Sequence, residues 1–118
     1  MPVSESYLIF VQDQLSKLGP IQIKKMFGGA SLYFDNLIFG LIDDDTLYFK
    51  ADTITKSAYS EQSMPQFAPY MKNLNKPMPM PYWQVPEEVL NDPDVLFEWA
   101  KIAIQVALSM PKKKRKIL

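Results

Sequence analysis

The sequence predicts an α+β fold in which helices pack on an antiparallel sheet to form two layers. Apolar residues recur at helical spacing mainly near the two ends of the 118-residue chain. Between them lie short segments rich in β-branched and aromatic residues, separated by turn-forming residues. The intervening turns are short enough to join neighbouring antiparallel strands. The expected order of elements is therefore α-β-β-β(β)-α-β-α.

A first helix is expected over residues 4–18. The stripe from Leu8 to Leu15 follows helical spacing, with polar residues largely on the other side. Ser4 can cap the start of this helix. Gly19-Pro20 ends it, because proline cannot continue a helix.

Three turns divide the next part of the chain into strands. Gly28-Gly29 suits a turn or bulge where a positive φ or a close backbone approach is needed. Asp35-Asn36 suits a two-residue hairpin, and the Asp43–Asp45 run suits the turn that follows. The strands are expected over residues 21–27, 30–34, 37–42 and 46–50, with the apolar segment 37–42 in the centre of the sheet.

The proline-rich segment 64–81 is expected to be irregular. Asp52 can cap a short helix over residues 53–61 before it. Proline removes donors from a strand ladder, so segment 64–81 suits an edge strand or an extended crossing. Residues 80–85 are expected to be extended and to pack Tyr82 or Trp83 onto the sheet.

The clearest helix is expected over residues 93–110. Pro86 opens a turn of helix just before it, and Asp92 caps it with Pro93 at its first position. Residues 1–111 are expected to form a single domain, followed by a disordered basic tail over residues 112–118. The apolar face of the last helix is predicted to comprise Val95, Leu96, Trp99, Ile102, Ala103, Val106 and Met110.

The composition excludes several classes of chemistry. The chain contains no cysteine and no histidine. It therefore lacks disulfides, thiol nucleophiles, the Ser-His-Asp triad and the usual ligands of zinc and iron. We expect no catalytic residue, no cofactor and no metal site, and predict that the protein is not an enzyme.

A cytoplasmic location is expected. The first residues, MPVSESYLIFVQDQL, lack the basic and continuous apolar regions of a secretory signal. The longest apolar run, residues 37–42, is too short to span a bilayer.

Four motifs that could carry chemistry are better explained by structure. A phosphate loop needs a helix after it, whereas a strand is expected after Gly28-Gly29. Asp43–Asp45 could bind a hard cation but lacks the rest of a calcium loop, which favours a solvated turn. Glu87-Glu88 and the pair Asp92 and Asp94 could act in acid–base catalysis. Each pair also sits at a helix start, where the helix dipole favours negative charge.

The aromatic and methionine residues of the irregular segment form a candidate partner surface. Methionine-rich surfaces adapt to peptide ligands. The competing explanation is ordinary packing of an irregular segment on the sheet, and a small-ligand pocket is a further alternative. The candidate residues are Tyr70, Met78, Met80, Tyr82 and Trp83.

The charge is unevenly distributed along the chain. Five of the 13 basic residues lie between positions 112 and 116, which leaves 8 basic and 13 acidic residues elsewhere and a net charge of about −5 there. An acidic body would not itself be drawn to nucleic acid. The tail sequence PKKKRK matches a basic nuclear-import signal, could contact nucleic acid by charge, or could simply be a solvated tail. The candidate contacts are Lys112, Lys113, Lys114, Arg115 and Lys116.

Several motifs resemble one bacterial family. Lys25-Met26-Phe27-Gly28-Gly29, Leu47-Tyr48-Phe49-Lys50-Ala51-Asp52 and the segment YWQVPEEVL over residues 82–90 look like the N-terminal domain of the TfoX/Sxy family of competence regulators. The resemblance covers roughly residues 15–110. It implies a stand-alone, secretion-chaperone-like α+β domain of bacterial origin, with no catalytic residues to carry over.

The resulting hypothesis is a non-enzymatic regulatory or protein-interaction module, linked to competence or transcription. The alternative is a nucleic-acid-associated protein that binds through the basic tail, and the third is a small-ligand-binding domain. The expected partners are an unidentified protein, nucleic acid at the tail and a second copy in a homodimer, with no membrane.

Overall fold

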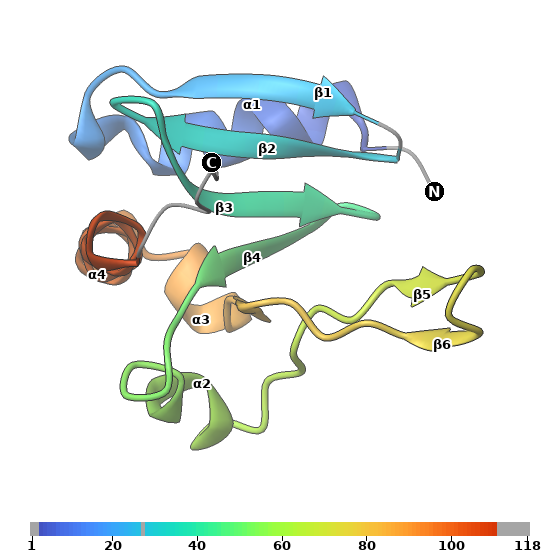
Figure 1. The fold of residues 1–118 in the computed structure, drawn as a ribbon. Coiled ribbons are helices and arrows are strands. Elements are labelled where there is room, and N and C mark those ends of the chain that lie inside the picture. Colours follow the sequence, from blue (N-terminus) through green and yellow to red (C-terminus); the bar gives the residue numbers. More distant parts are fainter. Residues whose placement is uncertain (1–2, 27, 111–118) are drawn as a thin grey trace, which may run out of the picture.

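The computed structural model describes residues 3–26 and 28–110, which form a five-stranded antiparallel sheet packed against helices (Figure 1). The order of the large sheet is β1-β2-β3-β4-β7, and β5 and β6 form a separate pair. The predicted α+β class and the central position of residues 37–42 are therefore confirmed. The strands are β1 (Gln22–Met26), β2 (Gly29–Phe34), β3 (Leu37–Asp43), β4 (Thr46–Lys50), β5 (Tyr70–Met71), β6 (Lys76–Pro77) and β7 (Tyr82–Gln84). The helices are α1 (Glu5–Gln14), the 3-10 turn η1 (Ser16–Leu18), α2 (Ser57–Ser60), α3 (Glu87–Leu90) and α4 (Pro93–Ser109).

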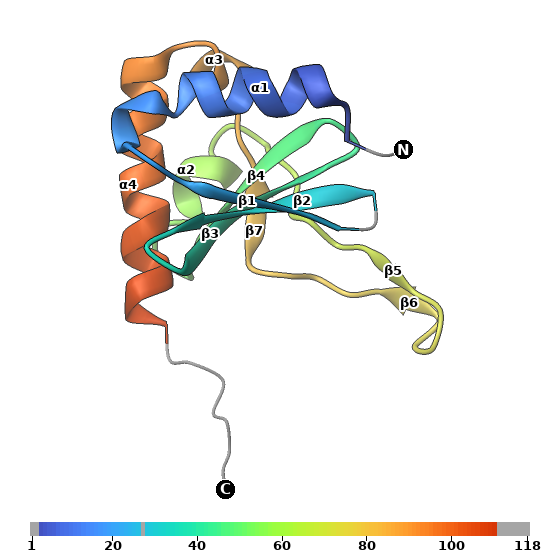
Figure 2. The same ribbon diagram turned by 90° about the horizontal axis from the view of Figure 1, so that it is seen from above.

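One face of the large sheet, called the inner face here, is covered by helices. Helix α1 lies over β1 and β2, and α4 packs against β3 and β4 (Figures 1 and 2). The core between these layers is apolar, and its burial supplies the main stabilisation of the fold. The largest fully buried side chains are Phe39, Phe49, Leu15, Leu32, Ile42, Leu47, Leu96 and Val11.

Among the described residues, no helix is long and apolar enough to cross a membrane.

The first helix is shorter than the expected residues 4–18. Ser4 caps α1 as predicted, because its Oγ accepts a hydrogen bond of 3.2 Å from the Tyr7 N–H. The α-helix ends at Gln14, and the last turn tightens into η1. Gly19, at φ 83°, then turns the chain toward β1.

The acidic turns have the backbone conformation of two-residue hairpins. Asp35 and Asn36 have φ values of 52° and 66°, and Asp44 and Asp45 both have φ of 52°. Type I′ hairpin turns require positive φ at both central residues, and Asp and Asn tolerate it better than most residues. Both predicted turns are confirmed.

Gly29 is required by a close approach between strands. Met26 pairs with Gly29 across the β1–β2 turn, so Gly29 belongs to β2 rather than to the loop. A Cβ atom at Gly29 would lie 2.1 Å from the carbonyl oxygen of Ile42. A strand follows Gly28, so the structural interpretation of this pair is confirmed.

A bulge in β3 changes which side chains face the helices. Leu32 pairs with Gly40, whereas Tyr33 pairs with Ile38, which leaves Phe39 without a partner on β2. Phe39 is fully buried, with its ring centroid 5.8 Å from that of Phe49. Ile38 is thereby directed to the opposite, outer face.

Helix α4 begins as predicted, and Leu96, Ala103 and Val106 of its expected apolar face are buried, but the rest of that face differs. The Asp92 carboxylate accepts hydrogen bonds from the N–H groups of Asp94 and Val95. Val95 and Ile102 were expected in the apolar face but are 38% and 50% exposed. Small residues occupy the close approach to the sheet instead, and the buried positions of α4 are Leu96, Ala100, Ala103, Val106 and Ala107.

The helix expected over residues 53–61 is reduced to one turn. The Asp52 carboxylate accepts from the N–H groups of Ile54 and Thr55, which forms a turn before the helix. Helix α2 begins only at Ser57. Its buried Tyr59 meets the ring of Trp99 on α4 edge-on at 4.9 Å, and this contact fixes α2 to the body.

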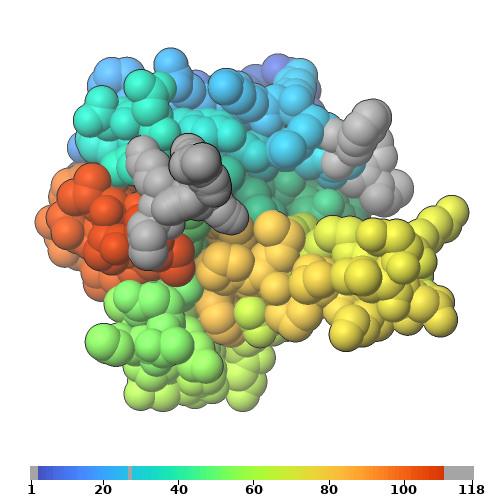
Figure 3. Space-filling view, in the orientation of Figure 1, coloured from blue at the N-terminus to red at the C-terminus, as the bar shows by residue number. Residues whose placement is uncertain are grey.

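Residues 65–71 and 76–84 form a long two-stranded ribbon, called the Pro/Met ribbon here. The N–H of Phe67 donates to the Tyr82 carbonyl, the N–H of Gln84 to that of Pro65, and the N–H of Met78 to that of Pro69. These prolines take part through their carbonyls, which fits the edge position predicted for this segment. The tip of the ribbon, β5 and β6, projects beyond the body (Figure 3).

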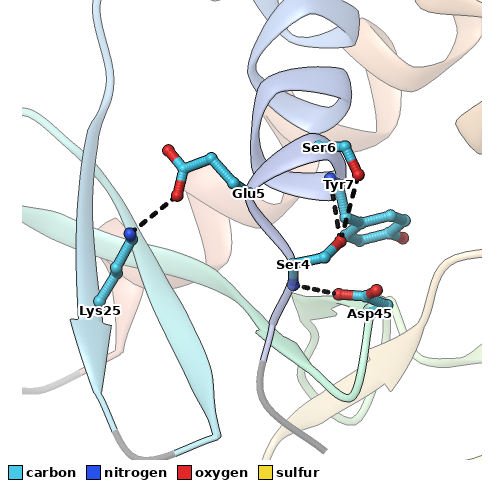
Figure 4. A network of polar contacts seen from close by, with 6 residues as sticks. All are labelled: Ser4, Glu5, Ser6, Tyr7, Lys25 and Asp45. Carbon is cyan, nitrogen blue, oxygen red and sulfur yellow. Dashed lines mark hydrogen bonds and ion pairs between the residues drawn. The ribbon is translucent and has the colours of Figure 1, made fainter.

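Polar contacts fix the start of α1 to two other elements (Figure 4). The Ser4 N–H donates to the Asp45 carboxylate at 2.8 Å, which joins the helix to the β3–β4 turn. The Lys25 ammonium lies 2.9 Å from the Glu5 carboxylate and joins the helix to β1. Asp45 is exposed, as expected for a solvated turn, and its carboxylate has this contact in addition.

Candidate partner-binding site

The outer face of the sheet is built from the residues that alternate with the core. Because directly paired residues share a face, the strand register gives the rows of this face. One row contains Lys24, Ser31, Leu41, Tyr48 and Gln84. A second row contains Gln22, Tyr33 and Ile38, and farther along it the pair Lys50 and Tyr82.

An apolar groove of about 450 Å³ lies between this outer face and the Pro/Met ribbon. Ile38 and Leu41 from β3 contribute to one side, and Phe67, Pro69, Met71 and Met80 from the ribbon contribute to the other. Met26 and Gly29 lie at the β1–β2 end, near Asp43. Ile38, Leu41, Phe67, Met71 and Met80 are only partly buried, so the groove retains accessible apolar surface.

Ser31 holds one side chain of the groove in place. Its side chain is 4% exposed, and its hydroxyl donates to the Met26 sulfur at 3.0 Å. Met26 itself is 59% exposed. A flexible thioether is therefore anchored at its sulfur but remains accessible at the mouth of the groove.

Tyr82, a predicted partner residue, lines the groove but is only 5% exposed. Burial, together with the proximity of Tyr33, raises the pKa of the Tyr82 phenol to about 12. The ammonium of Lys50 lies 5.5 Å from the centroid of the Tyr82 ring. In the same way, the ammonium of Lys24 lies 5.1 Å from the centroid of the Tyr33 ring.

Lys50 lies in an environment that disfavours its charge. Its partial burial lowers the pKa of its ammonium group. Among the described residues, the lysines within ion-pair distance of a carboxylate are Lys17, Lys25 and Lys101. Lys24 and Lys50 contact aromatic faces, which attract cations more weakly than a desolvated carboxylate does.

The predicted partner surface divides into separate places. Met80 and Tyr82 line the groove. Tyr70 is 59% exposed at the ribbon tip, where its hydroxyl donates to Asn75. Met78 is partly buried in the ribbon, and Trp83 packs against the core beside Phe49 on the inner face.

The groove also contains residues that the sequence interpretation missed. One signal was available, because residues 37–42 are apolar at nearly every position. A strand with apolar side chains on both faces is normally covered on both faces. The missed lining residues with large apolar side chains are Met26, Ile38, Leu41 and Phe67.

A smaller hollow of about 290 Å³ lies beside α1 and contains Tyr7, Asp45, Gln84 and Glu87. Burial and the neighbouring Asp45 carboxylate raise the pKa of the Tyr7 phenol to about 12. Within residues 3–26 and 28–110, no cluster of three Asp, Glu, His or Cys side chains is arranged to hold a metal.

The remaining acidic motifs lie where helices begin. Glu87 and Glu88 are in the first turn of α3, and Asp92 and Asp94 start α4. This agrees with their structural interpretation. The basic residues 112–116 lie outside the described residues, so their predicted nucleic-acid contact stays a prediction.

Comparison with known proteins identifies relatives of this chain. The family described as the TfoX N-terminal domain matches residues 13–107. Protein Sxy of Escherichia coli (strain K12) is 27% identical over 97 residues, which cover 82% of this chain and 46% of Sxy. The chain thus spans about half the length of this curated relative.

Proposed function

The chain belongs to the TfoX N-terminal domain family, and on this premise we propose that it is a regulatory module that acts by binding a protein partner rather than by catalysis. Its regulatory role is in competence or transcription, as the family resemblance implies. The observation that carries the proposal is the accessible apolar groove between the outer sheet face and the Pro/Met ribbon.

The composition of the groove supports protein binding. Contiguous accessible apolar surface on a small domain often marks an interaction site. Met26, Met71 and Met80 contribute unbranched, polarisable side chains that adjust to different partner shapes. Phe67, which is partly buried, adds aromatic surface of the kind enriched in protein interfaces.

The proposal is tested in cells by introducing a charge into the groove. Leu41 is partly buried, and Leu41→Glu would place a carboxylate among apolar side chains. Ile54→Glu is the matched control, because Ile54 is 79% exposed and does not line the groove. Transcripts and DNA uptake in cells with each variant are compared with those of cells lacking the gene. Photo-crosslinking from position 71 is compared between the variants and the wild-type protein.

We expect Leu41→Glu to lose the crosslinked protein partner and to reproduce the regulatory effect of deleting the gene. Ile54→Glu should retain both. The proposal is wrong if deletion changes neither transcripts nor DNA uptake, or if Leu41→Glu protein that remains folded keeps the partner and the regulatory effect. A small apolar ligand is the competing occupant, and recovery of such a ligand in place of a crosslinked protein would also refute the proposal.

A further inference from the structure

The charges around the groove differ from those of the rest of the body. Residues 1–111 carry about −5 overall. Lys24 and Lys50 nevertheless project from the outer sheet face, and Lys76 lies in β6 near the ribbon tip. Among the described residues that line the groove, Asp43 is the only acidic one. An approaching segment therefore meets an apolar surface with lysines around it.

The two sheet lysines are held near the face by tyrosine rings. Lys24 lies over Tyr33 and Lys50 over Tyr82, as described above. Tyr33 lies near enough to Tyr82 to add to the effect of burial in raising the pKa of the Tyr82 phenol. These contacts pre-position the ammonium groups, which lowers the entropic cost of binding an anion.

The register gives the groove a direction. Asp43 pairs with Gly29 and Thr46, at the end where Met26 lies. Lys50 pairs with Tyr82, and this pair lies in the same row as Ile38, at the other end of the groove. One end is therefore acidic and the other basic, with Leu41 between them in the alternation of β3.

We propose that the groove binds a peptide segment of a protein partner that carries apolar side chains and, at one end, an Asp or Glu side chain directed toward Lys50. The proposal rests on the proposed function and adds the chemistry and orientation of the partner. A carboxylate at the Lys50 end would gain a charge-assisted hydrogen bond. The same group at the opposite end would face Asp43 and be repelled.

The shape and charge of the site favour a peptide over other anionic partners. A groove of about 450 Å³ accommodates a small number of side chains and is walled by the ribbon. Nucleic acid carries no aliphatic side chains to fill such a groove. An anionic vesicle presents a broad surface that would contact the projecting ribbon before it reached Leu41.

The test is selection of a random 12-residue peptide library on the wild-type full chain, with Leu41→Glu as the counter-selection protein. Binding of the enriched synthetic peptides is then measured by fluorescence anisotropy. We expect them to combine apolar residues with Asp or Glu at one end. Their affinity should fall about five- to tenfold in Lys50→Glu and weaken in high salt, because a charge pair becomes a repulsion.

Matched variants separate charge from folding. Lys56→Glu makes the same charge change at an exposed lysine outside the groove lining and should retain wild-type affinity. Lys50→Met keeps much of the side-chain length without the charge and should show a smaller loss than Lys50→Glu. Thermal unfolding of each variant verifies that it is folded.

The possible results separate this inference from the proposed function. Peptides that depend on Leu41 but lack acidic residues and tolerate Lys50→Glu would overturn the inference and leave peptide binding intact. Failure to enrich any Leu41-dependent peptide would contradict both. Anionic phosphatidylglycerol vesicles serve as a second probe, and Lys50-dependent vesicle binding in place of peptide binding would also overturn the inference.

Discussion

The backbone N–H of Ser4 donates a hydrogen bond of 2.8 Å to the carboxylate of Asp45, 41 positions away in the sequence. The Ser4 hydroxyl also accepts from the Tyr7 N–H at 3.2 Å. A single residue thereby caps α1 and ties it to the β3–β4 turn. The helical layer and the sheet are joined at this point by polar contacts as well as by the core.

We predict that Asp45→Gly destabilises the protein by about 1 kcal/mol, measured by urea unfolding. Glycine accepts the positive φ of this position, so the change isolates the loss of the acceptor for Ser4. Asp35→Gly is the control, because Asp35 has the same φ of 52° in the other hairpin turn. Equal stability changes in the two variants would show that the Ser4 contact contributes nothing.

Gly29→Ala should be more destabilising, by about 2–3 kcal/mol. Its new methyl group would overlap the Ile42 carbonyl oxygen, and both groups belong to paired strands that can shift little. Gly19→Ala is the comparison, because Gly19 has φ of 83° but a methyl group there would meet no atom within 4 Å beyond its chain neighbours. Gly19→Ala therefore reports backbone strain at a positive φ, whereas Gly29→Ala reports steric overlap. Chemical unfolding measures both variants, and a Gly29→Ala protein as stable as the wild type would contradict the steric argument.

The protein should lose stability as the pH rises from about 10 to about 12. Burial raises the pKa of Tyr82 to about 12 and raises that of Tyr59 strongly. In the unfolded chain these phenols ionise near pH 10, while the folded protein keeps them protonated. Their contribution is therefore complete below pH 10 and is lost as pH rises through the folded pKa.

Urea unfolding across this pH range measures the effect. Tyr82→Phe should make the decline less steep, because it removes one phenol whose ionisation favours unfolding. Stability between pH 7 and pH 9 serves as the internal control for this group and should show no such decline. An unchanged slope in Tyr82→Phe would mean that this phenol ionises equally easily in both states.

DNA binding, if measured, should reside in the basic tail. Positions 112–116 carry five positive charges, whereas the rest of the chain has a net charge of about −5 and would repel DNA. Deleting residues 111–118 should abolish retention of DNA, since no comparable basic run precedes them in the sequence. In the full chain, the logarithm of affinity should fall with the logarithm of salt concentration with a slope no steeper than about −4.5. DNA affinity that survives the deletion would place the binding surface on the body.

The local order of the fold could be predicted from short-range signals. Positive φ at Asp35 and Asn36 follows from what these residues tolerate, and Asp92-Pro93 marks a helix start through a cap and a fixed φ. The length of α2 could not be predicted in the same way. Asp52 satisfies N–H groups equally well in a turn or at a helix cap, so its presence does not fix where the helix begins.

Only part of the groove could be predicted, because it depends on tertiary structure. Met80 and Tyr82 could be predicted because aromatic and methionine residues are frequent in and beside the irregular segment. Strict alternation from Ile42 would place Ile38 in the core, but the bulge at Phe39 reverses that assignment. Phe67 reaches the groove because the ribbon folds back beside the sheet, a relationship between distant segments that no local pattern encodes.

The two borders of the large sheet have a further consequence for the behaviour of the protein at high concentration. Strand β1 is short and places Lys24 and Lys25 on opposite faces, while the other border carries the prolines of the ribbon. Charged side chains and missing N–H donors both hinder the addition of another strand. The molecule can thus expose an apolar sheet surface to a partner while resisting fibril growth through its strand edges.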